Sequence, residues 1–120
     1  MEGHVSWVIE LAVKDGALDS FTELREEMVA GSSPEPGTLG YEWYISADQG
    51  TVHIFEKYVS SEAMISHVNG FLEKWAGRFL ECVDVTRFVV YGDPSPAARQ
   101  ILDGFGAVYL GPWGGFSRFS

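Results

Sequence analysis

The sequence predicts an α+β domain whose elements follow the order β-α-β-β-α-β, with a C-terminal extension. Three observations carry this prediction: apolar residues alternate in four segments, recur at helical spacing in two others, and are separated by turn or capping residues. The chain has 120 residues, enough for one domain that buries a core without disulfide or metal support.

Composition and charge exclude several classes of protein. The formal net charge of -9 argues against a nucleic-acid partner, because binding a phosphate backbone requires clustered Lys and Arg. The first apolar run is interrupted by Glu10 and lacks a basic segment before it, so we expect neither a signal peptide nor a membrane span. The single cysteine, Cys82, cannot form an intramolecular disulfide, and a small domain without disulfides is expected in the cytoplasm. Cys82 itself is expected to be buried rather than reactive.

Four strands are expected at residues 5–13, 38–46, 51–59 and 83–91. The second and third are joined by Asp48-Gln49-Gly50, in which Gly50 would supply the positive φ of a short hairpin. Side chains are expected to alternate along each strand without interruption, so that each strand has one row of residues on a single face. In chain order these rows are Val5, Trp7, Ile9, Leu11 and Val13; Leu39, Tyr41, Trp43 and Ile45; Val52, Ile54, Glu56 and Tyr58; and Val83, Val85, Arg87, Val89 and Tyr91.

The first helix is expected to start between Gly16 and Ser20 and to end near Ala30. Ser20-Phe21-Thr22-Glu23 has the form of a capping box, and Gly31 is suited to a left-handed C-terminal cap. The segment 31–37 contains too many prolines and glycines for a regular element and is expected to be a loop.

The second helix is expected to follow Ser60 and Ser61, either of which can cap it. Gly70 is the expected place for this helix to break or kink. A last short helix, capped by Ser95 with Pro96 at its first position, is expected to run to about Leu102. The tail beyond it is rich in glycine and aromatic residues, including Phe119, and needs a surface to lie on.

This order of elements is typical of the ferredoxin-like split βαβ fold. It places the first and third strands in the centre of an antiparallel sheet, with both helices on one face and the other face bare. We expect the rows that begin at Val5 and Leu39 to lie on the bare face and to be covered by a second copy of the chain. The prediction is therefore a homodimer in which residues 1–92 form the domain and residues 93–120 form a helix and tail that pack on the dimer.

A family resemblance rests on the stretch EWYISADQGTVHIFEKYVSSEAMISH. It contains a strand ending in Glu56 and Tyr58, then Ser61-Glu62, Ala63 and a helix histidine, His67. In this pattern the chain resembles the antibiotic biosynthesis monooxygenase family of the dimeric α+β barrel superfamily, over about residues 5–92. The resemblance implies a small dimer. Such families include cofactor-independent oxygenases of aromatic polyketides, haem-degrading enzymes, signal-molecule isomerases and proteins of unknown role.

His67 and Glu56 are the candidate catalytic residues. His67 lies on the helix that should cover the sheet, where it is either a general base or a hydrogen-bonded histidine at the edge of the core. Glu56 is placed on a largely apolar strand face, so it is either an acid or base with a raised pKa or one half of a salt bridge with Arg87. Haem-degrading relatives use a helix histidine as iron ligand, a position His67 could match, and a first-strand asparagine that is lacking here.

Aromatic side chains are numerous enough either to line a pocket for a flat substrate or simply to form the core. The candidate substrate-binding residues are Tyr58, Trp43, Trp75, Phe71, Phe88 and Arg87. His53 is expected at a surface or interface, and His4 in solvent. The three histidines have no pair at short ligand spacing, so we expect no metal site and no cofactor.

Two functions are compatible with these residues. The first is a cofactor-independent monooxygenase or related oxidoreductase that acts on a small aromatic or quinol-like molecule, with His67 or Glu56 as base. The second is a non-catalytic dimer that binds a small hydrophobic ligand. Polar groups that converge in the pocket would favour catalysis, whereas an apolar void would favour sequestration.

Overall fold

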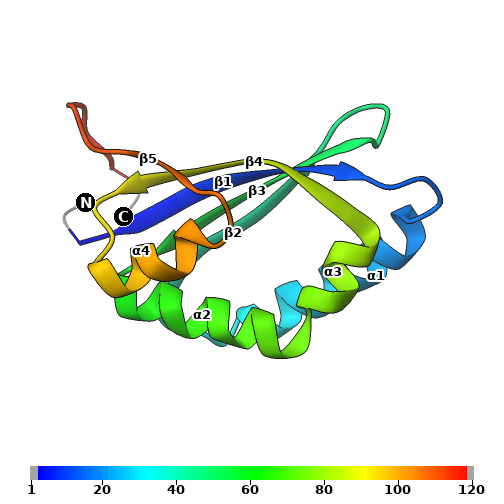
Figure 1. Ribbon diagram of the computed structural model, residues 1–120, viewed down its shortest axis with the longest axis horizontal. Helices are drawn as coiled ribbons and strands as arrows, with labels where there is room; N and C mark the ends of the chain where they lie inside the picture. The colour runs from blue at the N-terminus through cyan, green and yellow to red at the C-terminus, as the bar shows by residue number, and fades with distance from the viewer. Residues whose placement is uncertain (1–2, 119–120) are drawn as a thin grey trace.

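A computed structural model describes residues 3–118 and consists of one sheet with helices packed against one of its faces (Figure 1). The strands, in the sheet order β2-β3-β1-β4-β5, are β1 Val5–Val13, β2 Thr38–Ile45, β3 Thr51–Tyr58, β4 Val83–Gly92 and β5 Val108–Leu110. The first four strands pair antiparallel with β1 and β3 in the centre, which confirms the ferredoxin-like α+β fold. Strand β5, which was not expected from the sequence, adds to the edge, parallel to β4. In the hairpin between β2 and β3 the positive φ, 62°, falls on Gln49 and not on Gly50 as expected.

The helices are α1 Leu18–Ser32, α2 Ser61–Lys74, α3 Ala76–Cys82 and α4 Pro96–Asp103. Two of the expected caps are present: the Ala63 amide donates to Ser60 Oγ at 3.1 Å, and the Ala98 amide donates to Ser95 Oγ at 3.2 Å. None of these helices is long and apolar enough to span a membrane.

Helix α1 does not use either of the expected signals. It begins after Ala17 without a side-chain cap, so Ser20 lies inside the helix, and it continues through Gly31 to Ser32. The reason for a glycine at position 31 is packing, because a Cβ there would lie 2.7 Å from Cζ2 of the Trp75 ring. Gly31 therefore lets helix α1 approach Trp75 closely.

The break in the second helical segment falls at Trp75, not at Gly70. Helix α2 passes through Gly70, and Trp75 then takes φ -129°, ψ -21° before α3 begins. Met64, His67 and Val68 bury one face of α2, and this packing outweighs the roughly 1 kcal/mol that an internal glycine costs. The break turns the chain where the Trp75 side chain is buried under Gly31.

Strand β4 does not alternate without interruption. Its pairing with β1 shifts at Glu10/Leu11, so that Glu10 pairs with Arg87 whereas Leu11 pairs with Val85, leaving Thr86 as an extra residue. A bulge of this kind reverses the phase of alternation. Phe88 and Val90 consequently share the helix-facing side with Val83, and Arg87 lies on the opposite side.

The rows that were expected on the bare face lie under the helices instead. Val5, Trp7 and Leu11 are at most 3% exposed and pack with helix residues in two core clusters. Tyr41 and Trp43 of β2 pack against the same layer. The face without helices, hereafter the outer face, instead carries a mixed set of side chains, among them Val8, Glu10, His53, Phe55, Arg87, Val89 and Tyr91.

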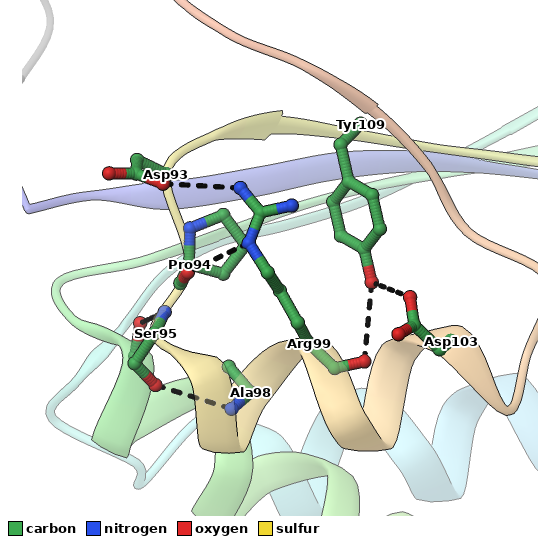
Figure 2. A network of polar contacts seen from close by, with 8 residues as sticks. Asp93, Pro94, Ser95, Ala98, Arg99, Asp103 and Tyr109 are labelled. Carbon is green, nitrogen blue, oxygen red and sulfur yellow. Dashed lines mark hydrogen bonds and ion pairs between the residues drawn. The ribbon is translucent and has the colours of Figure 1, made fainter.

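The C-terminal extension is fastened to the domain by α4 and β5. Figure 2 shows Arg99 of α4 reaching Asp93 at 3.1 Å and the Pro94 carbonyl at 3.2 Å, while its guanidinium stacks on the Tyr109 ring. The Tyr109 hydroxyl donates to Asp103 at 2.6 Å. Ala98 and Leu102 are fully buried in the core. Farther along the tail Trp113 is fully exposed, and Phe119 lies outside the described residues.

Candidate functional site

A cavity lies between the sheet and helix α2, and its volume is about 490 Å³ when the open mouth is included. The extension contributes Leu102 and Phe105 to its wall, so the last part of the chain helps to enclose it. The lining is mostly aromatic and aliphatic: Trp7, Ile9, Met28, Tyr41, Ile54, Glu56, His67, Val68, Phe71, Phe79, Phe88, Leu102 and Phe105. Among the described residues that line it, only Tyr41, Glu56 and His67 carry ionisable groups.

Glu56 brings a carboxyl group to the apolar, helix-facing side of β3. Its residue is 7% exposed, and its Oε1 accepts a short hydrogen bond from the hydroxyl of Tyr58, two residues along the same strand face. Burial raises the pKa of Glu56, against the opposing effects of His67 and of hydrogen bonds from Tyr58 and Trp7. The result is a carboxyl group that holds its proton at a higher pH than a glutamate in water.

His67 of α2 lies between two carboxyl groups. Its Nε2 is 3.5 Å from Glu56 Oε1, and its Nδ1 is 2.8 Å from Glu35 Oε1. The residue is 4% exposed, and its ring centroid is 5.3 Å from those of Tyr41 and Tyr58. The structure thus brings Glu56, Tyr58 and His67 together from strand β3 and helix α2.

Glu35 is the member of this cluster that sequence reasoning missed. It comes from the loop between α1 and β2, where Pro34 and Pro36 flank it and no periodic pattern assigns a direction to its side chain. An isolated carboxylate within a loop of prolines and glycines was the one available signal. It does not distinguish a solvated side chain from one that turns inward.

The two tyrosines near Glu56, Tyr41 and Tyr58, have raised pKa values. Burial and the nearby charge of Glu56 raise the pKa of Tyr41 well above its usual range. The same two causes act on Tyr58, whose pKa is also raised. Both phenols therefore stay protonated, and that of Tyr58 donates its hydrogen bond to Glu56.

The expected substrate-binding residues divide into two groups. Phe71 and Phe88 line the cavity, and Tyr58 is fully buried beside it through its bond to Glu56. Trp43 and Trp75 do not line it. Trp43 packs against Phe21 and Tyr41 with centroid separations of 5.7 Å, and Trp75 packs in the core next to α1.

Arg87 does not pair with Glu56. Because of the bulge in β4, Arg87 is exposed on the outer face, whereas Glu56 points toward the helices. On that face Glu10 Oε1 lies 3.1 Å from His53 Nε2, and Glu10 Oε2 accepts from the Thr86 hydroxyl at 2.8 Å. His53 is exposed, as expected for a surface or interface residue, and His4 is half-buried where exposure was expected.

The residues of the cavity do not fit haem ligation. Nδ1 of His67 faces Glu35 Oε1 at 2.8 Å, and no Lys or Arg is among the described residues that line the cavity to pair with the two carboxylates of haem. Within residues 3–118, no group of three or more His, Cys, Asp or Glu side chains is arranged to hold a metal ion. Cys82 is buried and free.

Comparison with known protein families shows to which family the chain belongs. The sequence model of a family described as antibiotic biosynthesis monooxygenase matches residues 5–76, more than half of the chain. The chain belongs to the antibiotic biosynthesis monooxygenase family. The match includes β1 to β3 and all of α2, and therefore Glu35, Glu56, Tyr58 and His67.

Solved structures show the same fold at low sequence identity. MupZ from Pseudomonas fluorescens superimposes with a TM-score of 0.79 at 17% identity, covering 96% of this chain and 94% of its own. A putative antibiotic biosynthesis monooxygenase from Nitrosomonas europaea gives 0.68 at 19% identity, covering 80% and 95%. SnoaB from Streptomyces nogalater, a cofactor-independent oxygenase, gives 0.64 at 16% identity, covering 78% and 95%. No curated protein matches the sequence of this chain.

Proposed function

We propose that this family member is a cofactor-independent monooxygenase that acts on a small, uncharged aromatic or quinol-like substrate bound in the cavity. The observation that carries the proposal is the convergence of Glu56 and His67, 3.5 Å apart, on the wall of a cavity that is otherwise almost entirely apolar. Family membership and the fold shared with the oxygenase SnoaB support the same reaction type.

The lining indicates which substrates fit. Aromatic walls such as Trp7, Phe71 and Phe88 favour a flat, apolar ring system. No Lys or Arg is among the described residues that line the cavity, so a buried anion would find no positively charged partner there. A neutral substrate with a hydroxyl group is therefore favoured over a carboxylate or a phosphate.

In the proposed reaction His67 or Glu56 removes a proton from the electron-rich substrate. The resulting carbanion transfers electrons to O₂ and forms a carbon–oxygen bond, giving a peroxide. Loss of water from this peroxide leaves a carbonyl group, so that one oxygen atom stays on the substrate. The other leaves as water with the two hydrogens that the carbon has lost. The apolar walls hold the substrate in position and keep bulk water away.

The test is oxygen uptake with a panel of anthrones and quinols. We expect His67→Ala to reduce the rate by roughly 10²- to 10⁴-fold, the range that a general base supplies. Glu73→Ala is the control, because Glu73 is exposed on the same helix as His67 and is outside both the cavity lining and the outer face, so this variant should leave the rate unchanged. Absence of uptake, or uptake indifferent to His67→Ala, removes this mechanism. Thermal stabilisation by these compounds without turnover would instead support a ligand-binding protein.

We also propose that the protein is a homodimer joined through its outer face. The helices cover the opposite face of the sheet, whereas on the outer side Val108 and Leu110 of the edge strand are 55% and 51% exposed. Phe55 and Tyr91 extend this apolar surface across the sheet. A second copy would remove it from water.

A further inference from the structure

The loop that carries Glu35 is held tightly against helix α2. The Glu35 amide donates to the Ser32 carbonyl at 3.0 Å, and the Val59 amide donates to the Gly37 carbonyl at 2.9 Å. A Cβ at Gly37 would lie 2.5 Å from the Cβ of Ala63, so only glycine permits this approach. Because Ala63 precedes His67 by one helical turn, the contact sets the loop beside the histidine.

The carboxyl group of Glu35 is itself fixed in direction. Its Oε1 accepts a hydrogen bond from the Thr38 hydroxyl at 2.8 Å and lies 2.8 Å from His67 Nδ1. The Glu35 side chain is 31% exposed, whereas that of His67 is 4% exposed. Glu35 Oε1 is the acceptor in the bond from Thr38, and a carboxylate oxygen can only accept a hydrogen bond. Nδ1 must then be the nitrogen that carries the proton.

We propose that Glu35 is a positioning residue that holds His67 in the Nδ1–H tautomer, so that the unprotonated Nε2 faces Glu56 and the cavity. This inference rests on the proposed oxygenase function, within which it identifies His67 Nε2 as the atom that accepts the substrate proton. The proton is held on Nε2 while O₂ reacts and is returned to the departing oxygen as water forms. During that interval Glu35 stabilises the imidazolium through Nδ1–H.

The groups around the ring agree with this assignment. Nδ1 faces the loop and Glu35, whereas Nε2 faces strand β3, where Glu56 Oε1 is 3.5 Å away and in turn accepts from Tyr58. Tyr41 of β2 meets the ring at an interplanar angle of 69°, as an edge contact. A protonated Glu56 or a substrate hydroxyl can donate to Nε2 only when that nitrogen lacks a proton.

The tautomer can be measured without any substrate, by long-range ¹H–¹⁵N NMR of the imidazole nitrogens. Three histidines are present, and His67→Ala identifies the signals of His67 by their loss. In the unsubstituted protein we expect a neutral His67 ring protonated on Nδ1. In Glu35→Ala the population should move toward the Nε2–H form. Glu35→Leu, which fills the space but also lacks an acceptor, should give the same change.

Glu73→Gln is the matched control, since Glu73 is an exposed carboxylate on the same helix as His67. A tautomer unchanged in both Glu35 variants, or changed equally by Glu73→Gln, would overturn the positioning role regardless of any activity. If a substrate is oxidised, both Glu35 variants should lower kcat roughly tenfold to a hundredfold with little change in KM. This loss should be smaller than the loss caused by His67→Ala, which removes the base itself. A tautomer shift without any oxygen uptake would support Glu35 as positioning residue and remove the oxygenase proposal instead.

Discussion

Glu56 shows how burial can outweigh several favourable interactions of one side chain. His67, Tyr58 and Trp7 all favour its charged form, yet the pKa of this carboxyl is raised because burial acts more strongly. In the unfolded chain the same group loses its proton at a lower pH. Between the two pKa values the folded state binds more protons, so the contribution of Glu56 to stability falls as pH rises.

Glu56→Gln should remove this dependence. The amide resembles the protonated carboxyl in shape and can still accept from Tyr58. We therefore expect the free energy of unfolding of the variant, relative to the unsubstituted protein, to increase as pH rises from about 4 to about 8. Urea denaturation across this range measures it. Glu73→Gln, at an exposed position, provides the comparison. A Glu56→Gln difference that does not vary with pH would contradict the assignment.

At the level of elements, helix α1 is defined by what it packs against more than by its capping residues. The capping box beginning at Ser20 is unused, and the expected terminal Gly31 lies within the helix. Helix α2 likewise passes through Gly70 and ends where the Trp75 ring is buried. Gly31 and Trp75 are therefore two sides of one close contact between α1 and the α2–α3 junction.

Gly31→Ala should destabilise the fold by about 1–3 kcal/mol, the usual cost of overpacking, because its new methyl group would collide with the Trp75 ring. Gly77→Ala is the matched control: this glycine is also helical, and a Cβ there meets nothing within 4 Å. That variant should stabilise the protein by up to about 1 kcal/mol through helix propensity alone. Thermal and urea unfolding of both variants measure the contrast, and equal effects would refute the packing argument.

For the whole molecule, the decisive feature is which face of the sheet the helices cover. Val5, Trp7 and Leu11 of β1 pack with the helices, as do Tyr41 and Trp43 of β2, whereas Leu39 and Ile45 at the ends of β2 are 47% and 51% exposed. The proposed dimer interface is consequently a more mixed surface, in which Glu10, His53 and Arg87 accompany the apolar side chains. Such a mixed surface resembles an ordinary protein interface more closely than a core cut in half.

Sedimentation at micromolar concentration should show a dimer, and Leu110→Lys should shift the population toward monomer. Leu80→Lys is the control, because Leu80 is exposed to a similar extent, 55% against 51%, but lies on helix α3 away from the outer face. A monomer in the unsubstituted protein would end the dimer proposal. If Leu110→Lys and Leu80→Lys change the fraction of dimer equally, the interface lies elsewhere.

The sequence by itself determined the order of the first four strands and of the helices that connect them, the cap at Ser95, and the presence of Glu56 and His67 on neighbouring elements, whereas it left Ser60 and Ser61 as alternative caps and did not predict β5. The features that it determined depend on period-2 or helical spacing within one segment, which is local information. The tertiary structure alone decided that the bulge at Thr86 turns Arg87 outward, that Trp43 and Trp75 pack outside the cavity, and that Glu35 reaches His67. Each of these depends on register or on a close approach between segments distant in the chain, which no local pattern encodes.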